Sequence, residues 1–299
     1  MVVPIALVTD STAYLSAKER AAHRIGVVPL HVVIGGQEFS EGVDVTPAQV
    51  AEALRSFTPV STSRPSPQAF ADVYADAVAD GASGIVSVHI SADMSSTIGS
   101  AQLAAAQADV PVRVVDSRVL GGAMAYAVLA GVKAAAGGAD LDEVAGVVEQ
   151  RCAGAACFFY VDTLEYLRRG GRIGKASALL GSALAIKPIL GLVDGHIVAL
   201  EKVRTASRAI GRLEELAVDA IEQAADGADV VVHHLDAAQR ADTLADRLSQ
   251  RLGGRQRIGV VELGAVVGAH VGPGTLAVAV VPHVSVWPRA PVGPNRSPG

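Results

Sequence analysis

The segment Ile5-Ala6-Leu7-Val8-Thr9-Asp10-Ser11-Thr12 joins an apolar, strand-like run to small hydroxyl and acidic residues. The same order recurs where residues 84–88 run into His89-Ile90-Ser91 and where residues 112–115 run into Asp116-Ser117. Strands that alternate with helix-length segments favour right-handed crossovers and a parallel sheet. Because open parallel sheets bind ligands at the carboxyl ends of their strands, we expect a weakly charged or anionic small ligand at this edge.

Composition limits the class of protein. The 299 residues are enough for two domains, half of them are apolar, and aromatic residues make up only 4%, so the core must be aliphatic. A formal net charge of −5 argues against a nucleic-acid partner, because phosphate contacts need clustered Lys and Arg. Charges interrupt the apolar runs before the ~18–20 residues of a membrane span, and no signal peptide is visible. These features predict a cytoplasmic protein.

Two α/β domains are predicted, over residues 1–150 and 151–284. The first is expected to be Rossmann-like, with a parallel sheet. The second has shorter strands that are more often linked as hairpins, such as residues 186–190 and 196–200, so we expect a mixed sheet there. Residues 285–299 are rich in proline and poor in apolar residues, which predicts a disordered tail.

Local signals place the turns and helices. Thr46-Pro47 and Ser66-Pro67 each combine an N-cap with a proline at the first helical position, and Gly35-Gly36 predicts a hairpin turn after a strand over residues 26–34. Helices are expected over residues 16–23, 48–56, 68–80, 95–107, 121–136, 140–153, 163–168, 175–184, 206–225 and 237–252.

Two hydroxyl-rich segments are candidates for a ligand site. Ser61-Thr62-Ser63-Arg64-Pro65-Ser66-Pro67 holds four hydroxyls beside two prolines, but by itself it is typical of a solvated turn that caps a helix. Residues 91–100 follow a buried strand and open a helix at Ser95-Ser96-Thr97. Unpaired N–H groups and the helix dipole favour an anion there, and Ser95 and Ser96 could add hydroxyl donors. Ser95 alone would be explained as an N-cap.

Four cations, Arg168, Arg169, Arg172 and Lys175, surround the Gly-Gly turn at residues 170–171. They could grip a phosphate or dock an acidic partner surface, although a solvated loop is the more common meaning of such a charge run. The Gly-x-x-x-x-Gly-Lys-Ser/Thr spacing of a P-loop is missing.

His270 lies among small residues, 264–275, where we expect a loop whose glycines let the backbone approach a ligand. A hydrolase that uses Ser95 and His270 is an alternative, but Ser95 lacks the Gly-x-Ser-x-Gly elbow. The pair His233-His234 points to opposite faces of a strand and cannot chelate well. Neither metal-ligand spacing nor Gly-x-Gly-x-x-Gly is present, so we predict no metal and no cofactor.

Seven motifs occur in the order found in one known family. They are Val8-Thr9-Asp10-Ser11-Thr12, Thr62-Ser63-x-Pro65-Ser66-Pro67, the helix start Ser95-Ser96-Thr97, Val114-Val115-Asp116-Ser117, Thr163-Leu164-Glu165-Tyr166-Leu167-x-x-Gly170-Gly171-Arg172-Ile173, Ile186-Lys187-Pro188-Ile189 and His270-Val271-Gly272-Pro273-Gly274. With these motifs the chain resembles the DegV family over about residues 4 to 283.

This resemblance implies a two-domain α/β protein that binds one long-chain fatty acid between its domains and is not a catalyst by itself. Family members are the lipid-binding subunit of bacterial fatty acid kinase. They present the carboxylate to a separate ATP-dependent kinase subunit, which forms an acyl phosphate for phospholipid synthesis. The fatty acid is a ligand rather than a cofactor, and transient contact with a membrane is compatible with this role.

The resemblance also assigns residues. It implies a ligand-binding set made of Thr62, Ser63, Ser95, Ser96 and His270. Thr62 and Ser95 are expected to hold the carboxylate, and Arg172 to support docking of the kinase partner. Two positions depart from the family pattern, because Ser96 stands where Gly is usual and Arg64 where Gln is usual. Either change could alter which head group or chain is accepted.

Two other functions stay open at this point, namely a serine-dependent esterase using Ser95 and His270, and a phosphate- or nucleotide-binding module using residues 168–175.

A fatty-acid carrier would obtain most of its binding free energy from the acyl chain. An alkyl chain of ~16 carbons, buried at ~0.8 kcal/mol per CH₂, gives a gross ~13 kcal/mol before ordering costs. The apolar cavity would therefore supply most of the affinity and the polar end the orientation, and aliphatic residues over 176–192 are candidates for its lining.

Overall fold

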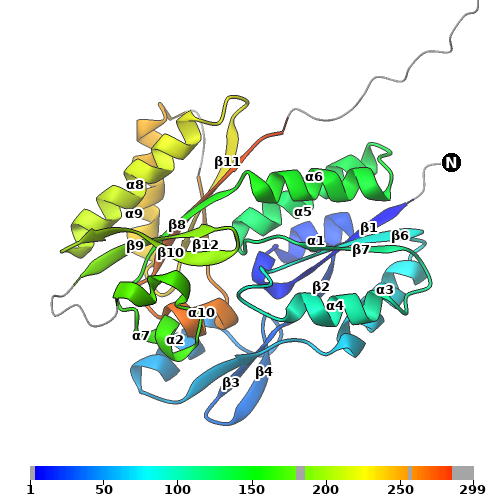
Figure 1. Cartoon of the computed structure of the whole chain (residues 1–299), viewed down its shortest axis with the longest axis horizontal. Coiled ribbons are helices and arrows are strands. Elements are labelled where there is room, and N and C mark those ends of the chain that lie inside the picture. Colours follow the sequence, from blue (N-terminus) through cyan, green and yellow to red (C-terminus); the bar gives the residue numbers. More distant parts are fainter. Residues whose placement is uncertain (1–3, 180–185, 255–257, 285–299) are drawn as a thin grey trace, which may run out of the picture.

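The computed structural model describes residues 4–179, 186–254 and 258–284 of the chain (Figure 1). Two larger sheets lie side by side with helices packed on them, and a small three-stranded sheet lies at the bottom of the view. This is the predicted combination of a parallel and a mixed sheet. Within the described ranges, no helix is both long and apolar enough to cross a membrane. The predicted disordered tail, residues 285–299, lies outside them.

The first sheet is fully parallel, with strand order β2-β1-β6-β7. Its strands are β1 (Ile5–Asp10), β2 (Gly26–Val28), β6 (Gly84–His89) and β7 (Val112–Asp116). Every residue of β6 is buried, as expected for a central strand that is covered on both faces. Thr9 pairs with Val88, and His89 pairs with Asp116. The polar strand ends therefore meet at one edge, as predicted.

Helices cover both faces of this sheet. Consecutive strand residues point to opposite faces, and because both sets are apolar, both faces need to be covered. Leu7, Val86 and Val88 pack against α5 and α6, whereas Val8 and Ile85 pack against α3 and α4. The helices of this half are α1 (Ala17–His23), α3 (Pro67–Ala79), α4 (Thr97–Ala105), α5 (Gly122–Ala136) and α6 (Leu141–Ala153), with a 3-10 turn η1 (Ser11–Ala13) after β1.

The second sheet has the order β10-β9-β8-β13-β11-β12, and only the pair β11 and β12 is parallel. Its strands are β8 (Ala156–Tyr160), β9 (Lys187–Val193), β10 (His196–Val203), β11 (Ala228–His234), β12 (Gly259–Glu262) and β13 (Leu276–Pro282). Helices α8 (Ala206–Glu222) and α9 (Ala238–Arg251) cover one face with aliphatic side chains. The shorter helices are α7 (Glu165–Arg169), η2 (Gly174–Leu179) and α10 (Ala265–Val271).

The small sheet has the order β4-β3-β5 and belongs to the segment between β2 and α3. Its elements are β3 (His31–Ile34), β4 (Gln37–Ser40), α2 (Pro47–Arg55) and β5 (Val60–Ser63). The Gly35-Gly36 hairpin is confirmed, with φ values of +59° and +91° that suit glycine. The segment packs on α10, where Val266 and Ala269 share a core with Leu30 and Val32. It therefore carries residues of the first half of the chain onto the second.

Several local predictions are wrong. The strand expected over residues 26–34 divides at Pro29, which has no N–H to donate, so β2 and β3 join different sheets. The turn expected around Thr62 is strand β5, in which Thr62 pairs with Val32 of β3. The loop expected over residues 264–275 contains helix α10. The helix expected over residues 175–184 is the 3-10 helix η2, and residues 180–185 lie outside the described part.

The two larger sheets are joined through α5. Val231, Ala279 and Val281 of the second sheet lie in the same apolar core as the buried face of α5. Gly122 permits this contact, because a Cβ at that position would overlap Val231 Cγ1. The positions of the domain boundaries, at residues 150 and 284, stay a prediction.

Candidate functional site

All of the predicted site residues line one cavity of about 270 Å³. Its polar lining consists of Thr62, Ser63, Arg64, Ser95, Ser96, Arg172 and His270. Its apolar lining consists of Leu30, Ile90, Met94, Leu120, Leu167, Ile197, Val266, Val267 and Val271. The residues come from the strand ends of the first sheet, from β5, from α7 and its following turn, from β10 and from α10. The fold therefore gathers motifs that lie as far as 208 residues apart.

Thr62 and His270 form one polar corner of the cavity. The Thr62 hydroxyl is 2.8 Å from Nε2 of His270. Because side chains alternate along a strand, Thr62 faces α10 while its neighbour Ser63 is turned away. The Ser63 hydroxyl donates instead to Glu38 Oε2, at 3.3 Å. Of these two predicted residues, Thr62 is the one whose hydroxyl lies beside His270.

Ser95 and Ser96 precede α4 and line the same cavity. The N-cap of α4 is Ser96, and no side chain makes a capping hydrogen bond. Ser95 is therefore not a simple N-cap, and its hydroxyl lies 2.7 Å from Oγ1 of Thr97. The first N–H groups of a helix have no partner within the helix, so this end of α4 offers donors next to the Ser95 hydroxyl.

Three strand-end groups hold the loop that carries Ser95. Asp10 accepts a hydrogen bond from Ile90 N at 2.9 Å, and Asp116 accepts one from Ala92 N at 3.1 Å. The Ser91 hydroxyl donates to Gly195 O at 3.0 Å, which ties the loop to the β9–β10 turn. The polar strand ends were expected to face the ligand, but Asp10 and Ser91 are buried and Asp10 acts through the loop backbone. The sequence predicted that the polar strand ends meet at one edge of the sheet. It did not show that Asp10 positions the loop backbone instead of facing the cavity.

His270 is held in a neutral, fixed state. Burial, and to a smaller extent the nearby charge of Arg172, lower the pKa of His270 to about 4. Its ring lies against Gly170, where an added Cβ would overlap Nδ1. Nδ1 is buried and makes no hydrogen bond to any described residue. If the proton of the neutral ring is on Nε2, the Nε2–H group donates to the Thr62 hydroxyl oxygen. The Thr62 hydroxyl hydrogen is then free to donate to a ligand.

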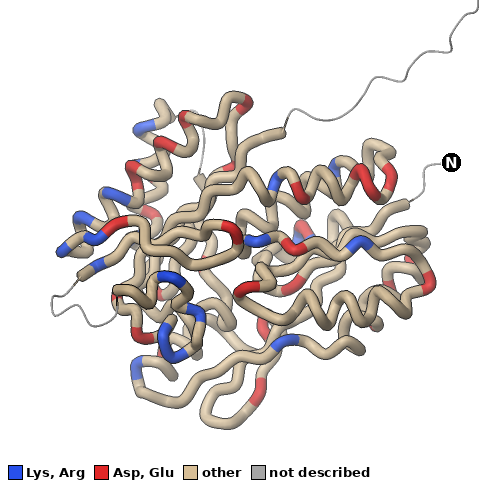
Figure 2. Tube along the Cα trace, viewed as in Figure 1, with Lys and Arg blue, Asp and Glu red and all other residues tan. Residues whose placement is uncertain are grey.

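Arg172 lines the cavity and donates hydrogen bonds to two backbone carbonyls. Its Nε donates to Met94 O at 3.0 Å, and its Nη1 donates to Gly170 O at 2.6 Å. Figure 2 shows the basic residues that gather at α7 and the turn after it. Arg168 and Arg169 of this group pair with Glu165 at 2.7 and 2.6 Å. The cluster therefore presents less uncompensated charge than the sequence suggests, which weakens the phosphate-binding alternative.

An apolar cavity of about 70 Å³ continues the polar one. The two share Met94, Leu120, Ile197, Val267 and Val271. The remaining lining is Cys157, Phe158, Phe159, Leu192, His233, Leu263, Thr275, Ala277, Val278 and Ala279. The two cavities therefore adjoin, one with hydroxyl groups in its lining and the other lined mainly by aliphatic and aromatic groups. Leu192 is the one described residue of segment 176–192 in this lining.

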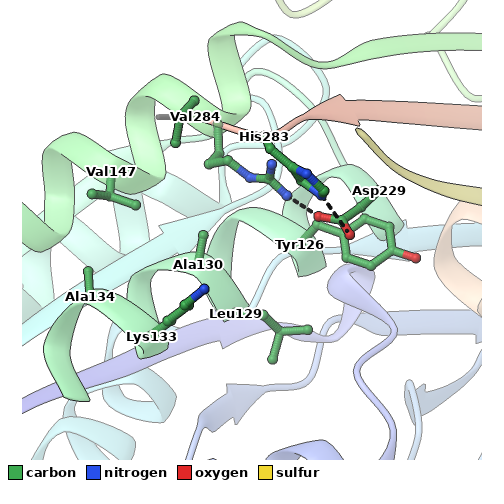
Figure 3. A pocket seen from close by; sticks show the side chains of 10 residues that line it. Tyr126, Leu129, Ala130, Lys133, Ala134, Val147, Asp229, His283 and Val284 are labelled. Carbon is green, nitrogen blue, oxygen red and sulfur yellow. Dashed lines mark hydrogen bonds and ion pairs between the residues drawn. The ribbon is translucent and has the colours of Figure 1, made fainter. Parts of the chain in front are cut away.

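A larger cavity of about 580 Å³ lies between α5, α6 and the ends of β11 and β13, and contains no predicted site residue (Figure 3). Two of its charged groups are paired with each other. Arg151 pairs with Asp229 and donates to the carbonyl of Pro282, and His283 Nε2 lies 3.3 Å from Asp229. These bonds tie α6 to the second sheet.

The geometry of Ser95 and His270 disfavours a hydrolase. The hydrogen-bond partners of Ser95 and His270 are Thr97 and Thr62, so the two do not form a nucleophile–base pair. Among residues 4–179, 186–254 and 258–284, no group of three or more His, Cys, Asp and Glu side chains could hold a metal ion.

Comparison with known proteins identifies the family. Residues 4–283 match the sequence model of the DegV family, a family of uncharacterised proteins. The chain belongs to the DegV family. A DegV domain-containing protein of Streptomyces coelicolor is 51% identical over 278 residues, which cover 92% of this chain and 98% of that protein.

Solved DegV structures share the fold. A DegV family protein from Thermus thermophilus, whose fatty acid binding has been described, superimposes with a TM-score of 0.85 at 31% identity, covering 94% of this chain and 100% of that chain. DegV of Bacillus subtilis, a fatty acid binding protein, gives a TM-score of 0.83 at 28% identity with the same coverage. These DegV relatives confirm the family resemblance and the fold class.

Proposed function

We propose that this protein binds one long-chain fatty acid, with the carboxylate between Thr62 and Ser95 and the acyl chain in the apolar cavity. The observation that carries the proposal is a cavity with hydroxyl groups in its lining that shares five lining residues with an adjoining apolar cavity. DegV proteins of known structure that bind fatty acids support it.

The head-group site is built to take a carboxylate without a buried lysine. The Thr62 hydroxyl, oriented by His270, and the Ser95 hydroxyl would each donate to one carboxylate oxygen, and the start of α4 adds N–H donors. Arg172, in the cavity wall, adds a positive charge that a carboxylate would favour. Ser96 and Arg64 lie beside the same end, so their departures from the usual family residues bear on head-group choice.

The acyl chain supplies most of the binding free energy in this proposal. Each buried CH₂ contributes ~0.8 kcal/mol, whereas a hydrogen bond to a charged group contributes ~1.5–3 kcal/mol. A chain of ~16 carbons therefore outweighs the head group severalfold. The acyl chain therefore supplies the larger share of the affinity, and the hydroxyls fix where the carboxylate lies and add a smaller share.

We infer further that the protein is a carrier and not a catalyst. It would present the carboxylate to a separate ATP-dependent kinase subunit that forms the acyl phosphate. Arg172 and the exposed basic residues of α7 are the candidate docking surface for that subunit, because Arg172 lines the cavity of the proposed head-group site and α7 directly precedes its turn. The carrier would work in the cytoplasm and contact the membrane transiently.

The double variant Thr62→Ala/Ser95→Ala tests this proposal. With the kinase subunit and ATP, the wild-type protein should support acyl-phosphate formation and the double variant should not. Unchanged formation by the double variant would contradict the proposal. A chromogenic ester assay on the same proteins tests the rival, since turnover that is lost in Ser95→Ala would indicate an esterase.

A further inference from the structure

The adjacent histidines of β11 have separate environments. His233 faces α5 and lines the apolar cavity, while His234 is buried on the opposite face and accepts a hydrogen bond from Ala237 N at 3.4 Å. In the sheet register, Ala277 lies between His233 and Phe159, and all three line the cavity. His233 is absent from the lining of the polar cavity, so it belongs to the part of the space farther from the carboxylate site.

The His233 ring cannot turn or retreat. Its Nε2 lies 2.9 Å from Gly122 N, and its Nδ1 lies 3.1 Å from Val261 O. A backbone N–H can only donate, so Nε2 is the acceptor and Nδ1 carries the proton. Burial, with only 4% of the residue exposed, lowers the pKa of His233 to about 4 and keeps the ring neutral. The Tyr14 ring packs edge-on against it at 5.9 Å.

The backbone behind the ring is equally close. A Cβ at Gly122 would lie 3.0 Å from Nε2, and one at Gly121 would lie 3.1 Å from it. The aliphatic residues that line the cavity can change rotamer to admit a longer ligand, but a ring with both nitrogens bonded and backbone against it cannot.

We propose that His233 is the fixed end wall of the apolar cavity and sets the longest acyl chain that the protein accepts. The inference rests on the proposed function and adds a specificity-determining residue to it. Wild-type affinity should rise about fourfold per added CH₂ until the chain reaches this ring, and then stop rising.

Three variants test the wall. His233→Asn shortens the side chain and keeps an N–H for Val261 O, so the limit should move up by one or two methylenes, with about 4- to 16-fold tighter binding of the newly admitted acids. Ala277→Val adds bulk beside the ring and should move the limit down. His234→Asn, on the other face of the same strand, is the matched control and should leave the limit unchanged.

The readout is native mass spectrometry of each protein after exchange with an equimolar mixture of saturated C12 to C20 acids. Opposite shifts for His233→Asn and Ala277→Val, with none for His234→Asn, are expected. An unchanged chain-length distribution in the first two variants would overturn the inference while leaving the proposed function intact, and if His233→Asn does not fold, Ala277→Val alone decides. Wild-type protein that takes up none of the acids would overturn the proposed function itself.

Discussion

Replacing Thr62 by Val removes one hydroxyl from the proposed carboxylate site and keeps the side-chain shape. Thr62 is on β5, where a β-branched residue suits the strand, so the backbone should be undisturbed. The substitution deletes the hydroxyl that lies 2.8 Å from His270 Nε2 and would donate to the ligand. A lost hydrogen bond to a charged group costs ~1.5–3 kcal/mol, so the Kd for a long-chain fatty acid should rise about 10- to 150-fold.

The expected change is larger for a charged head group than for a neutral one. The matching fatty alcohol has the same acyl chain without a charge, and its Kd should rise less, by about 2- to 13-fold, since a neutral hydrogen bond contributes only ~0.5–1.5 kcal/mol. Titration calorimetry or fluorescence displacement on delipidated protein gives both values. Ser61→Ala is the matched control, because Ser61 is an exposed residue of the same strand. A Kd for the fatty acid within twofold of wild type in Thr62→Val would refute the assignment of the carboxylate to this corner.

Further substitutions give distinct outcomes. Gly170→Ala should displace the His270 ring that lies against it and weaken fatty-acid binding at least tenfold, whereas Gly146→Ala, in open space on α6, should leave binding unchanged in the same titration. Asp10→Asn should lower the free energy of unfolding by about 1–3 kcal/mol in a urea titration, because the buried carboxylate accepts hydrogen bonds from Thr12 N and Ile90 N and the amide replaces one of its acceptor oxygens by a donor. An unchanged free energy of unfolding would count against this role. Glu41 accepts hydrogen bonds from Ser11 and Val266 N, and burial raises its pKa to about 7. Since the folded state holds the proton more tightly than the unfolded one, stability should fall by up to about 3 kcal/mol as the pH rises from 4.5 to 7, and Glu41→Gln should flatten that slope; an equal slope in both proteins would show that another group is responsible.

Sequence reasoning reached the parallel sheet because its signals are local. Three of its four strands, β1, β6 and β7, are short apolar runs that end in polar residues, and helices α1 and α3 open on side-chain caps at Ser16 and Ser66. It failed where the deciding contact is distant. Thr62 looked like part of a turn because its strand partner, Val32, is 30 residues away and belongs to a strand interrupted by Pro29. Helix α10, rich in small and β-branched residues, has few helix signals of its own and is held by packing on the small sheet.

The sequence was enough to predict which motifs line the site, but not which of their atoms contact one another. Thr62, Ser95 and His270 come from the motif resemblance, and all three line the cavity. The roles of Gly170 against His270, of Asp10 behind Ile90 and of His233 at the far end depend on contacts across more than 75 residues. The sequence drew attention to Gly170 and His233, because each belongs to a conspicuous pair, Gly170-Gly171 and His233-His234. Periodicity and spacing, however, do not show which residues these side chains and backbones contact.

The proposed function requires that the two adjoining cavities hold a long-chain fatty acid. The decisive experiment is native mass spectrometry of the full chain purified from a bacterial host, followed by solvent extraction and mass analysis of the released molecule. We expect one bound long-chain fatty acid per chain, with less retained by Thr62→Val than by Ser61→Ala. A protein that carries no lipid and takes up none from an added mixture, or one that carries a nucleotide instead, would contradict it.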